Sequence, residues 1–284
     1  MQSKNTEHRP TIGLALGGGA ARGLAHIVVL EALDEMGVKP DYISGCSIGA
    51  LLGAAYASGL EAKEIREHAL AVLGTPGKAI RQLFWPRGNG SAANAINFSL
   101  FRPVSLNGLG LVQQVMPPNT ALRIEDTKIP FSVVSTDFYA GCEVTIDSGE
   151  LESAVAASIA IPGVISAPKH KGRVMIDGAY TNPVPMCQIR AHGSDLLVAV
   201  DVTGKPVDDS KDPGPATLVL GATQIMQNRI SRLQSEIAKP DVMITPDIDR
   251  FAAHDFLKIK EILAAAEPER DRVKRRLEQL LKSI

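Results

Sequence analysis

The segments TIGLALGGGAARG (residues 11–23) and DYISGCSIG (residues 41–49) decide the fold of this chain. Each begins with a short apolar run, typical of a buried β-strand, and ends in a turn of small residues. Apolar residues at helical spacing follow each turn, over 23–36 and 48–58, and Gly37 is well placed to end the first helix. Strand, turn and helix in repetition predict an α/β fold with a mostly parallel sheet.

The rest of the chain continues the alternation of helices and strands. Hydrophobic periodicity predicts further helices over 61–73, 106–116, 151–158, 217–237 and 255–281, and further strands over 131–136, 143–146, 174–176 and 196–200. We expect three regions from this pattern: a polar tail (1–10), a core that carries the motifs (11–204) and a mainly helical C-terminal extension (205–284). The extension is expected to pack on the core within the same domain.

The composition excludes several classes of protein. Hydrophobic residues make up 45% of the chain and the net charge is −1, so a large core is expected and nucleic acid is not an expected partner. Three cysteines without a CxxC pair, and a polar tail without the apolar core of a signal peptide, favour a reducing cytoplasmic location. No acidic or thiol cluster has metal-ligand spacing, so neither a metal nor another cofactor is expected. The longest apolar stretch, 48–60, is too short to cross a membrane.

The turn Gly45-Cys46-Ser47-Ile48-Gly49 has the spacing of a nucleophile elbow. In such an elbow a serine lies on a sharp turn between a strand and a helix, and small flanking residues let the chain turn tightly enough to expose the hydroxyl. The predicted strand before Ser47 and the predicted helix after it supply this context. A serine that merely caps a glycine-rich helix is the alternative for Ser47. Cys46, one position before the apex, is expected to point into the packing.

A glycine-rich loop, GGGAARG, follows the first predicted strand over residues 17–23. Successive backbone N–H groups at the start of a helix bind anions, either a phosphate or the oxyanion that develops in ester hydrolysis. A dinucleotide-binding fold also places glycines here and needs an acidic residue about 20 residues further on. Asp41 lies near that spacing, but it precedes the second strand, and the end of that strand carries the serine elbow instead. The oxyanion interpretation is therefore favoured.

Asp177, at the end of a predicted strand, is the candidate general base. An ordinary turn aspartate is the structural alternative. His192 and His254 follow Asp177 and allow the Ser, Asp, His order of an α/β-hydrolase triad. The elbow of such enzymes follows several strands, whereas here it follows the second, so a Ser47–Asp177 dyad without histidine is preferred. His26, on the inner face of the first helix, is expected to be a core histidine with its hydrogen bonds satisfied.

Together these motifs resemble the patatin-like phospholipase family, most closely its bacterial members and the neuropathy target esterase branch. The resemblance spans about residues 11–202 and is carried by four blocks, which are LALGGGAARG from Leu14, GCSIGALLGAAYA from Gly45, ASIAIPG from Ala157 and the triplet Asp177-Gly178-Ala179. It implies a three-layer α/β/α sandwich with a mostly parallel central sheet. It also makes residues 11–204 a catalytic core.

The resemblance implies a role for each matching residue. Ser47 would attack an ester carbonyl to form an acyl-enzyme, and Asp177 would take its proton and return it to the leaving alcohol. The residues implied are Gly18, Gly19, Ala20 and Arg22 for the oxyanion hole, with Arg22 adding charge or bracing the loop, and Gly17, Gly23, Gly45, Gly49 and Gly178 for the turns. Ala20 stands where the plant-type loop has its third glycine, and alanine tolerates fewer backbone angles.

Two functions from different classes stay open on the sequence alone. The first is a lipid acyl hydrolase, such as a phospholipase A, a lysophospholipase or a carboxylesterase, acting on a lipid or a small ester. The second is a non-catalytic or regulatory module that binds an acyl lipid or a protein. The sequence does not specify an oligomeric state.

Two segments bear on peripheral contact with a membrane. The stretch 75–104, broken by Pro and Gly, contains Phe84 and Trp85 and is either a lid or membrane-contacting loop or an irregular loop packed on the core. The segment Glu269–Lys282 has six basic residues, which either contact anionic lipid or form a solvated helix face. The expected location is therefore the cytoplasm, with contact at the inner face of the membrane left open.

Overall fold

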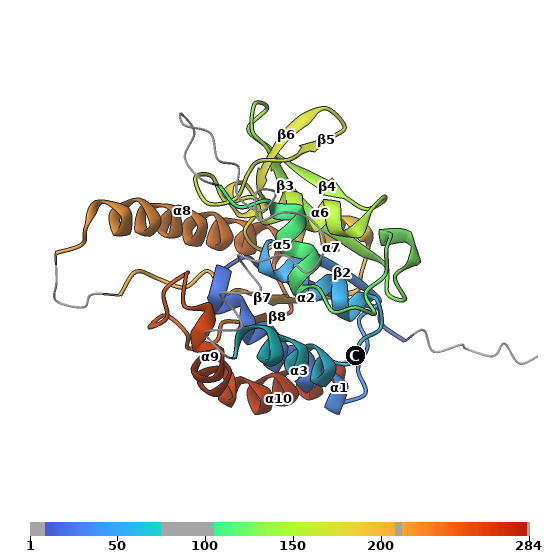
Figure 1. The fold of residues 1–284 in the computed structure, drawn as a ribbon. Coiled ribbons are helices and arrows are strands. Elements are labelled where there is room, and N and C mark those ends of the chain that lie inside the picture. The colour runs from blue at the N-terminus through green and yellow to red at the C-terminus, as the bar shows by residue number, and fades with distance from the viewer. Residues whose placement is uncertain (1–8, 75–104, 208–211, 283–284) are drawn as a thin grey trace, which may run out of the picture.

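The computed structural model describes residues 9–74, 105–207 and 212–282 and contains an eight-stranded twisted sheet (Figure 1). Its strands are β1 (Ile12–Leu16), β2 (Tyr42–Cys46), β3 (Phe131–Asp137), β4 (Cys142–Ile146), β5 (Lys169–His170), β6 (Arg173–Asp177), β7 (Leu196–Val200) and β8 (Val242–Ile244). They lie in the order β5-β6-β3-β2-β1-β7-β8, with β4 also paired to β3. β1, β2, β3, β7 and β8 are mutually parallel, whereas β4 and β6 run antiparallel to β3, and β5 runs antiparallel to β6.

Helices cover both faces of this sheet. They are α1 (His26–Glu35), α2 (Ile48–Ala57), α3 (Ala62–Leu73), α5 (Gly108–Val115), α6 (Leu151–Ser158), α7 (Met186–His192), α8 (Pro215–Ala238), α9 (Ile259–Ala266) and α10 (Pro268–Lys282), with short 3₁₀ helices η1 (Ala20–Ala25), η3 (Ile124–Asp126), η4 (Gly178–Tyr180) and η5 (Phe256–Lys258). The larger hydrophobic cluster joins α1, α2, α3, α5, α6, α9 and α10 to one face, and the smaller cluster joins α7 to the other. The predicted α/β fold with a mostly parallel central sheet is confirmed.

Alternation of side chains along the central strands supplies both clusters. In β1, Leu14 and Leu16 join the larger cluster and Ala15 joins the smaller one. In β7, Val198 joins the larger cluster and Leu197 the smaller one. Successive side chains of a strand point to opposite faces, so a strand covered on both faces is apolar throughout, and this continuous pattern identified both strands in the sequence.

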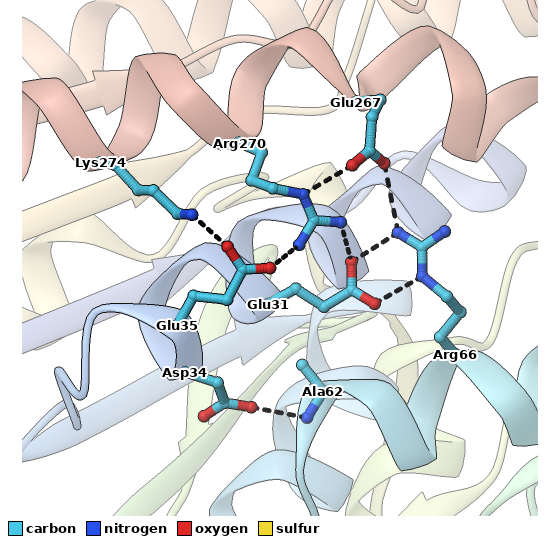
Figure 2. A network of polar contacts seen from close by, with 8 residues as sticks. All are labelled: Glu31, Asp34, Glu35, Ala62, Arg66, Glu267, Arg270 and Lys274. Carbon is cyan, nitrogen blue, oxygen red and sulfur yellow. Dashed lines mark hydrogen bonds and ion pairs between the residues drawn. The ribbon is translucent and has the colours of Figure 1, made fainter.

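The C-terminal elements share the sheet and one helical layer. β8 pairs with β7, and α10 packs along α1 through ion pairs (Figure 2). Arg270 donates to Glu31 over 2.5 Å and also to Glu35, which pairs in addition with Lys274. Arg66 of α3 donates two hydrogen bonds of 2.5 Å to the same Glu31. One half-buried network thus joins α1, α3 and α10.

The structure corrects several expectations from the sequence. The helices and strands listed from periodicity are all present, but β5, β8 and α7 were not predicted. The basic residues of Glu269–Lys282 were expected to contact lipid or face solvent, and Arg270 and Lys274 instead pair with carboxylates of α1. The stretch 75–104, considered as a lid, lies outside the described residues. Within the described ranges, no helix combines the length and the hydropathy needed to cross a membrane.

Arg270→Leu is expected to lower the free energy of unfolding by about 1–3 kcal/mol, because Glu31 and Glu35 each lose a cationic partner in a half-buried setting. Urea denaturation followed by circular dichroism measures the change. Arg275→Leu, at an exposed position of the same helix, is the control and should change stability by less than about 0.5 kcal/mol. Equal losses in the two variants would show that the ion pairs between α1 and α10 do not stabilise the fold.

Candidate active site

Sheet register brings the serine elbow and the candidate base together. The glycine-rich loop follows β1, Ser47 follows β2, and Asp177 ends β6. Cys46 of β2 lies beside Val134 of β3, and Asp177 lies beside Ser135, the next residue of β3. Ser47 and Asp177, 130 residues apart in the sequence, therefore meet across β3. The crevice outside the carboxyl ends of parallel strands is the usual place for a ligand in such sheets.

Ser47 occupies a sharp turn between β2 and α2, as the elbow motif predicts. Its backbone has φ +53° and ψ −122°, a conformation that a residue with a side chain rarely adopts. The flanking glycines make the turn possible, because a Cβ at Gly45 would lie 2.6 Å from the backbone of Ala50 and one at Gly49 would lie 2.2 Å from the carbonyl oxygen of Leu16. A strained backbone at the serine of a strand-to-helix turn is typical of a nucleophile elbow.

Ser47 and Asp177 are directly hydrogen-bonded. Ser47 Oγ donates to Asp177 Oδ2 over 2.6 Å, and Asp177 Oδ1 accepts from the N–H of Ala179 over 2.8 Å. Ser47 is 5% exposed and Asp177 is 3% exposed. Burial raises the pKa of Asp177 to about 6, although the bonds from Ser47 and Ala179 act in the opposite direction. A carboxylate with this pKa is ionised at neutral pH and is a stronger base than an ordinary aspartate.

Ser158 holds the elbow in place, a role that the sequence did not reveal. The backbone N–H of Ser47 donates to Ser158 Oγ over 2.7 Å, and this hydroxyl donates to the carbonyl of Val134 over 2.5 Å. Two residues later, the carbonyl of Ala160 accepts from the N–H of Asp177 over 3.0 Å. The ASIAIPG segment therefore fixes both members of the dyad. The one signal for Ser158 in the sequence is that it lies in ASIAIPG, one of the four blocks that carry the resemblance.

The glycine-rich loop passes directly over the elbow. A Cβ at Gly18 would lie 3.3 Å from the Cβ of Ser47. Gly18 was expected to help form the oxyanion hole, but its N–H donates to the carbonyl of Pro183 over 2.8 Å, which occupies this donor. No hydrogen bond among the described residues uses the N–H of Gly19 or Ala20. The free donors nearest the elbow along the loop are thus those of Gly19 and Ala20.

Ala20 and Arg22 show how this loop is held. Ala20 has φ +50°, in the left-handed region that favours glycine, so its replacement of the expected glycine leaves the backbone strained. The buried guanidinium of Arg22 donates to the carbonyls of Phe251 over 3.1 Å and Val202 over 3.4 Å. Of the two roles expected for Arg22, these contacts favour bracing of the loop.

His26 supports the same loop from the core. Its Nε2 lies 2.8 Å from the carbonyl oxygen of Gly17, and the side chain is fully buried. Burial lowers the pKa of His26 to about 4, so the ring is neutral at physiological pH and donates through Nε2. Nδ1 has no partner among the described residues. The prediction of a satisfied core histidine is therefore correct for one ring nitrogen and wrong for the other.

His192 and His254, the two candidates for the histidine of a catalytic triad, make no hydrogen bond to Ser47 or Asp177 in the described part of the chain. His192 stacks on the ring of Tyr42, with ring centroids 3.8 Å apart. His254 lies in an exposed turn before η5. The geometry agrees with the preferred dyad.

The structure disfavours the other two interpretations of the motifs, namely Cys46 as the nucleophile and the glycine-rich loop as a dinucleotide-binding site. Cys46 is fully buried, and burial raises the pKa of its thiol, so the thiol is poorly reactive. Asp41, considered as a ribose ligand, accepts from the N–H of Ile12 over 2.8 Å at the start of β1, and the glycine-rich loop follows the other end of that strand. The ranges that the structure describes hold no group of three or more His, Cys, Asp or Glu side chains suited to a metal ion.

An apolar cavity of about 250 Å³ opens beside Ser47. It lies between α2, α3 and α5, and residues 159–165 and Phe256 complete its wall. Its lining is almost entirely hydrocarbon, and Ser47 and His68 are the lining residues with polar side chains. A hydrocarbon chain bound in this cavity would end at the serine hydroxyl.

Comparisons with known proteins agree with this geometry. The sequence profile of a family described as patatin-like phospholipase matches residues 14–187. An uncharacterized NTE family protein of Mycobacterium tuberculosis is 35% identical over 206 residues, covering 72% of this chain and 53% of that protein. Patatin-like phospholipase domain-containing protein 6 of Homo sapiens is 29% identical over 237 residues, covering 82% of this chain and 16% of that protein. The chain thus spans about half the length of the mycobacterial relative.

The crystal structure of VipD from Legionella pneumophila matches with a TM-score of 0.49 and 14% sequence identity. The match covers 94% of this chain and 67% of that chain. The fold assignment itself rests on the sheet order and the family match.

Asp177→Asn is expected to raise the free energy of unfolding at pH 7.5 by about 3 kcal/mol. The pKa of Asp177 is about 6 in the folded protein and about 3.9 in an unfolded chain, a difference of about two units at about 1.4 kcal/mol each. The stability that the protonated carboxyl contributes is therefore fully present below pH ~4 and is lost as pH rises through about 6. Asparagine avoids this loss and can keep both hydrogen bonds, accepting from Ala179 and donating to Ser47 Oγ.

Urea denaturation of wild type and Asp177→Asn at several pH values between 4 and 7.5 tests this expectation. The difference should be near zero at the lowest pH and reach its plateau above pH ~6.5. Asp247→Asn, at an exposed position, is the control and should differ from wild type by less than about 0.5 kcal/mol. A difference that does not depend on pH would show that burial does not disfavour the ionised carboxylate of Asp177.

Proposed function

Because the chain belongs to the patatin-like phospholipase family, we propose that it is a serine hydrolase that removes acyl chains from lipid esters. The observation that carries the proposal is the 2.6 Å hydrogen bond from Ser47 Oγ to Asp177, made beside an apolar cavity. The proposed substrates are phospholipids, lysophospholipids or simple carboxylic esters. The mechanism needs no metal or other cofactor.

In the acylation step, Ser47 Oγ attacks the ester carbonyl carbon while its proton passes to Asp177 Oδ2. The carbonyl oxygen becomes an oxyanion, which the free N–H groups of Gly19 and Ala20 stabilise. Collapse of the tetrahedral intermediate breaks the bond to the alcohol oxygen, and Asp177 returns the proton to this leaving group. The acyl chain is then bound covalently to Ser47, with its hydrocarbon in the cavity.

In the deacylation step, water replaces the alcohol. Asp177 takes a proton from the water as the water oxygen attacks the acyl carbonyl, and the same N–H groups stabilise the second oxyanion. Return of the proton to Ser47 Oγ releases the carboxylic acid and restores the enzyme. One carboxylate thus acts as base and acid in both halves of the reaction, and its pKa of about 6 suits both tasks.

A module that only binds an acyl lipid is the second candidate function on this fold. Such a module needs the apolar cavity but gains nothing from a strained serine or from a buried carboxylate with a raised pKa. These two unfavourable features support the hydrolase. The experiment below separates the two functions.

Wild-type protein is expected to hydrolyse p-nitrophenyl esters and lysophosphatidylcholine, and Ser47→Ala and Asp177→Asn are each expected to lower kcat at least about 1,000-fold, because nucleophile and base act as a unit. A fluorophosphonate probe should label the wild type and leave Ser47→Ala unlabelled. Hydrolysis that survives Ser47→Ala would contradict the proposed nucleophile. Binding of lysophosphatidylcholine without hydrolysis or labelling would favour the binding module.

The histidine variants His192→Asn and His254→Asn are the matched controls for this experiment, and both should keep wild-type kcat. In the wild type, kcat/KM should rise with pH around about 6, because Asp177 must be ionised to accept the proton. If the rise of kcat/KM with pH disappeared in either histidine variant, the result would contradict the dyad and support a triad that includes that histidine.

Contact with a lipid surface through α8 is part of the proposal. Residues 213–228 contain no charged side chain, and Figure 1 shows the N-terminal half of α8 projecting beyond the sheet. The large apolar side chains exposed there are Leu218, Val219, Leu220, Ile225 and Met226. Arg229 and Arg232, on the following turns, supply positive charge for anionic headgroups. The proposed location is the cytoplasm, at the inner face of its membrane.

Two further exposed apolar residues lie at or next to the wall of the cavity. Val164 is 46% exposed and also lines the cavity, and Leu257, 43% exposed, follows the lining residue Phe256. α8 is tied to the turn after β7 by the hydrogen bond from Gln224 to the carbonyl of Thr203, over 3.1 Å. Exposed apolar patches of this kind commonly mark a membrane or protein contact.

The double variant Val219→Gln with Ile225→Gln is expected to bind vesicles of phosphatidylcholine and phosphatidylglycerol at least about fivefold more weakly than wild type, since two apolar side chains that would insert into the bilayer are lost. Cosedimentation measures the binding. Leu122→Gln, at a 77% exposed leucine just before η3, is the matched control and should bind like wild type. Unchanged vesicle binding by the double variant would contradict the membrane contact. So would a wild type that forms a dimer which the double variant loses, because α8 would then contact a second copy of the chain.

A further inference from the structure

The apolar cavity is elongated along α2. Ile48, Leu51, Leu52 and Ala55 line it from this helix. They are spaced by three, four and seven residues, so they form one stripe on a single face of the helix. The stripe begins next to Ser47, the residue that caps the start of α2. The cavity therefore runs along α2, away from the nucleophile.

The depth of the cavity follows from helix geometry. Ala55 lies eight residues after Ser47, and each residue of an α-helix rises 1.5 Å, so the deep end is about 12 Å from the nucleophile. An extended chain of single bonds advances about 1.2 Å per bond, because three backbone bonds span at most about 3.6 Å. A straight acyl chain of about ten carbons matches this depth.

The deep end is closed by the helices that face α2. Ile65 and His68, from the first turns of α3, line it, and α3 begins close to where α2 ends. Val115, the last residue of α5, lines it from the other side, and the His68 ring bonds the Val115 carbonyl over 3.0 Å. At the corner behind them, Ser58 Oγ accepts from the N–H of Ala121 over 2.9 Å. Three helices thus meet to form a floor.

Ala55 has a smaller side chain than Ile65, His68 and Val115, the other residues named at this floor. It is fully buried, at 0% exposure, and it lines the cavity opposite Ile65 and Val115. A larger side chain at position 55 projects into space that a substrate would otherwise fill. The size of the residue at this position therefore sets the length of chain that fits beneath Ser47.

We propose that the cavity measures the acyl chain: it accepts one chain of about ten carbons and excludes longer ones, with Ala55 as the residue that determines the limit. The inference rests on the proposed hydrolase function and names its preferred substrates as esters of medium-chain acids. Each methylene group up to the floor adds apolar contact, so the rate rises with chain length. Beyond the floor, a further methylene has no space and the rate falls.

A series of p-nitrophenyl esters from acetate to palmitate tests the proposal by kcat/KM. Wild type should be fastest near the decanoate and at least about tenfold slower on the palmitate. Ala55→Leu should lower the ratio of decanoate to acetate kcat/KM at least about tenfold and move the optimum to shorter chains. Val115→Phe adds volume at the same floor from a partly exposed position on α5. It should also lower the ratio of decanoate to acetate kcat/KM. Ala191→Leu, at an exposed position of α7, is the matched control for added volume and should keep the wild-type ratio.

Two results would overturn the chain-length limit. The first is a wild type that hydrolyses the palmitate as fast as the decanoate, and the second is an unchanged ratio in both folded filling variants. If no ester is hydrolysed and no fluorophosphonate label is taken up, the proposed function fails instead. The chain-length limit is then decided by calorimetric titration of Ser47→Ala with fatty acids, in which decanoate must bind more tightly than palmitate.

Discussion

Close backbone contact between the glycine-rich loop and the serine elbow is the constraint on which the site depends. A Cβ at Gly49 would lie 2.2 Å from the carbonyl oxygen of Leu16, and one at Gly23 would lie 2.0 Å from Ile48. Only glycine permits contacts this close, and they press the start of α2 against the end of β1. Ser47 and the free amides of the loop are therefore fixed next to each other at the ends of adjacent parallel strands.

The same small region concentrates conformations and charges that oppose folding. Ser47 and Ala20 have φ values of +53° and +50°, and the carboxyl of Asp177 has a raised pKa because it is buried. Each feature costs stability and is kept only because a well-packed surrounding structure enforces it. The large hydrophobic cluster on one face of the sheet and the half-buried ion pairs of Glu31 and Glu35 offset this cost at a distance from the chemistry. The contacts that stabilise the fold and the residues of the candidate site therefore lie in different parts of the structure.

Ser47 and Asp177, which the structure joins by a hydrogen bond, could be singled out from the sequence because each lies in a local motif with its turn residues adjacent. Contacts between distant segments could not be predicted in this way. Ser158 accepts from the N–H of Ser47 across 111 residues, and the occupation of the Gly18 donor depends on Pro183. β8 has three residues, Val242–Ile244, which is too short for an alternating pattern to stand out. The depth of the cavity likewise depends on how α3 and α5 close against α2, which periodicity does not specify.

The contacts that hold the glycine-rich loop extend beyond the segment that carries the motifs. The family match ends at residue 187, yet the buried guanidinium of Arg22 finds its acceptors at Val202 and Phe251. The N–H of Ala21, next to it, donates to the carbonyl of Ala253 over 3.0 Å. Without the residues after 204, the guanidinium of Arg22 would lose the acceptor at Phe251 and keep only the longer hydrogen bond to Val202. The C-terminal segment therefore helps to hold the glycine-rich loop against the elbow, although its own sequence contains no catalytic motif.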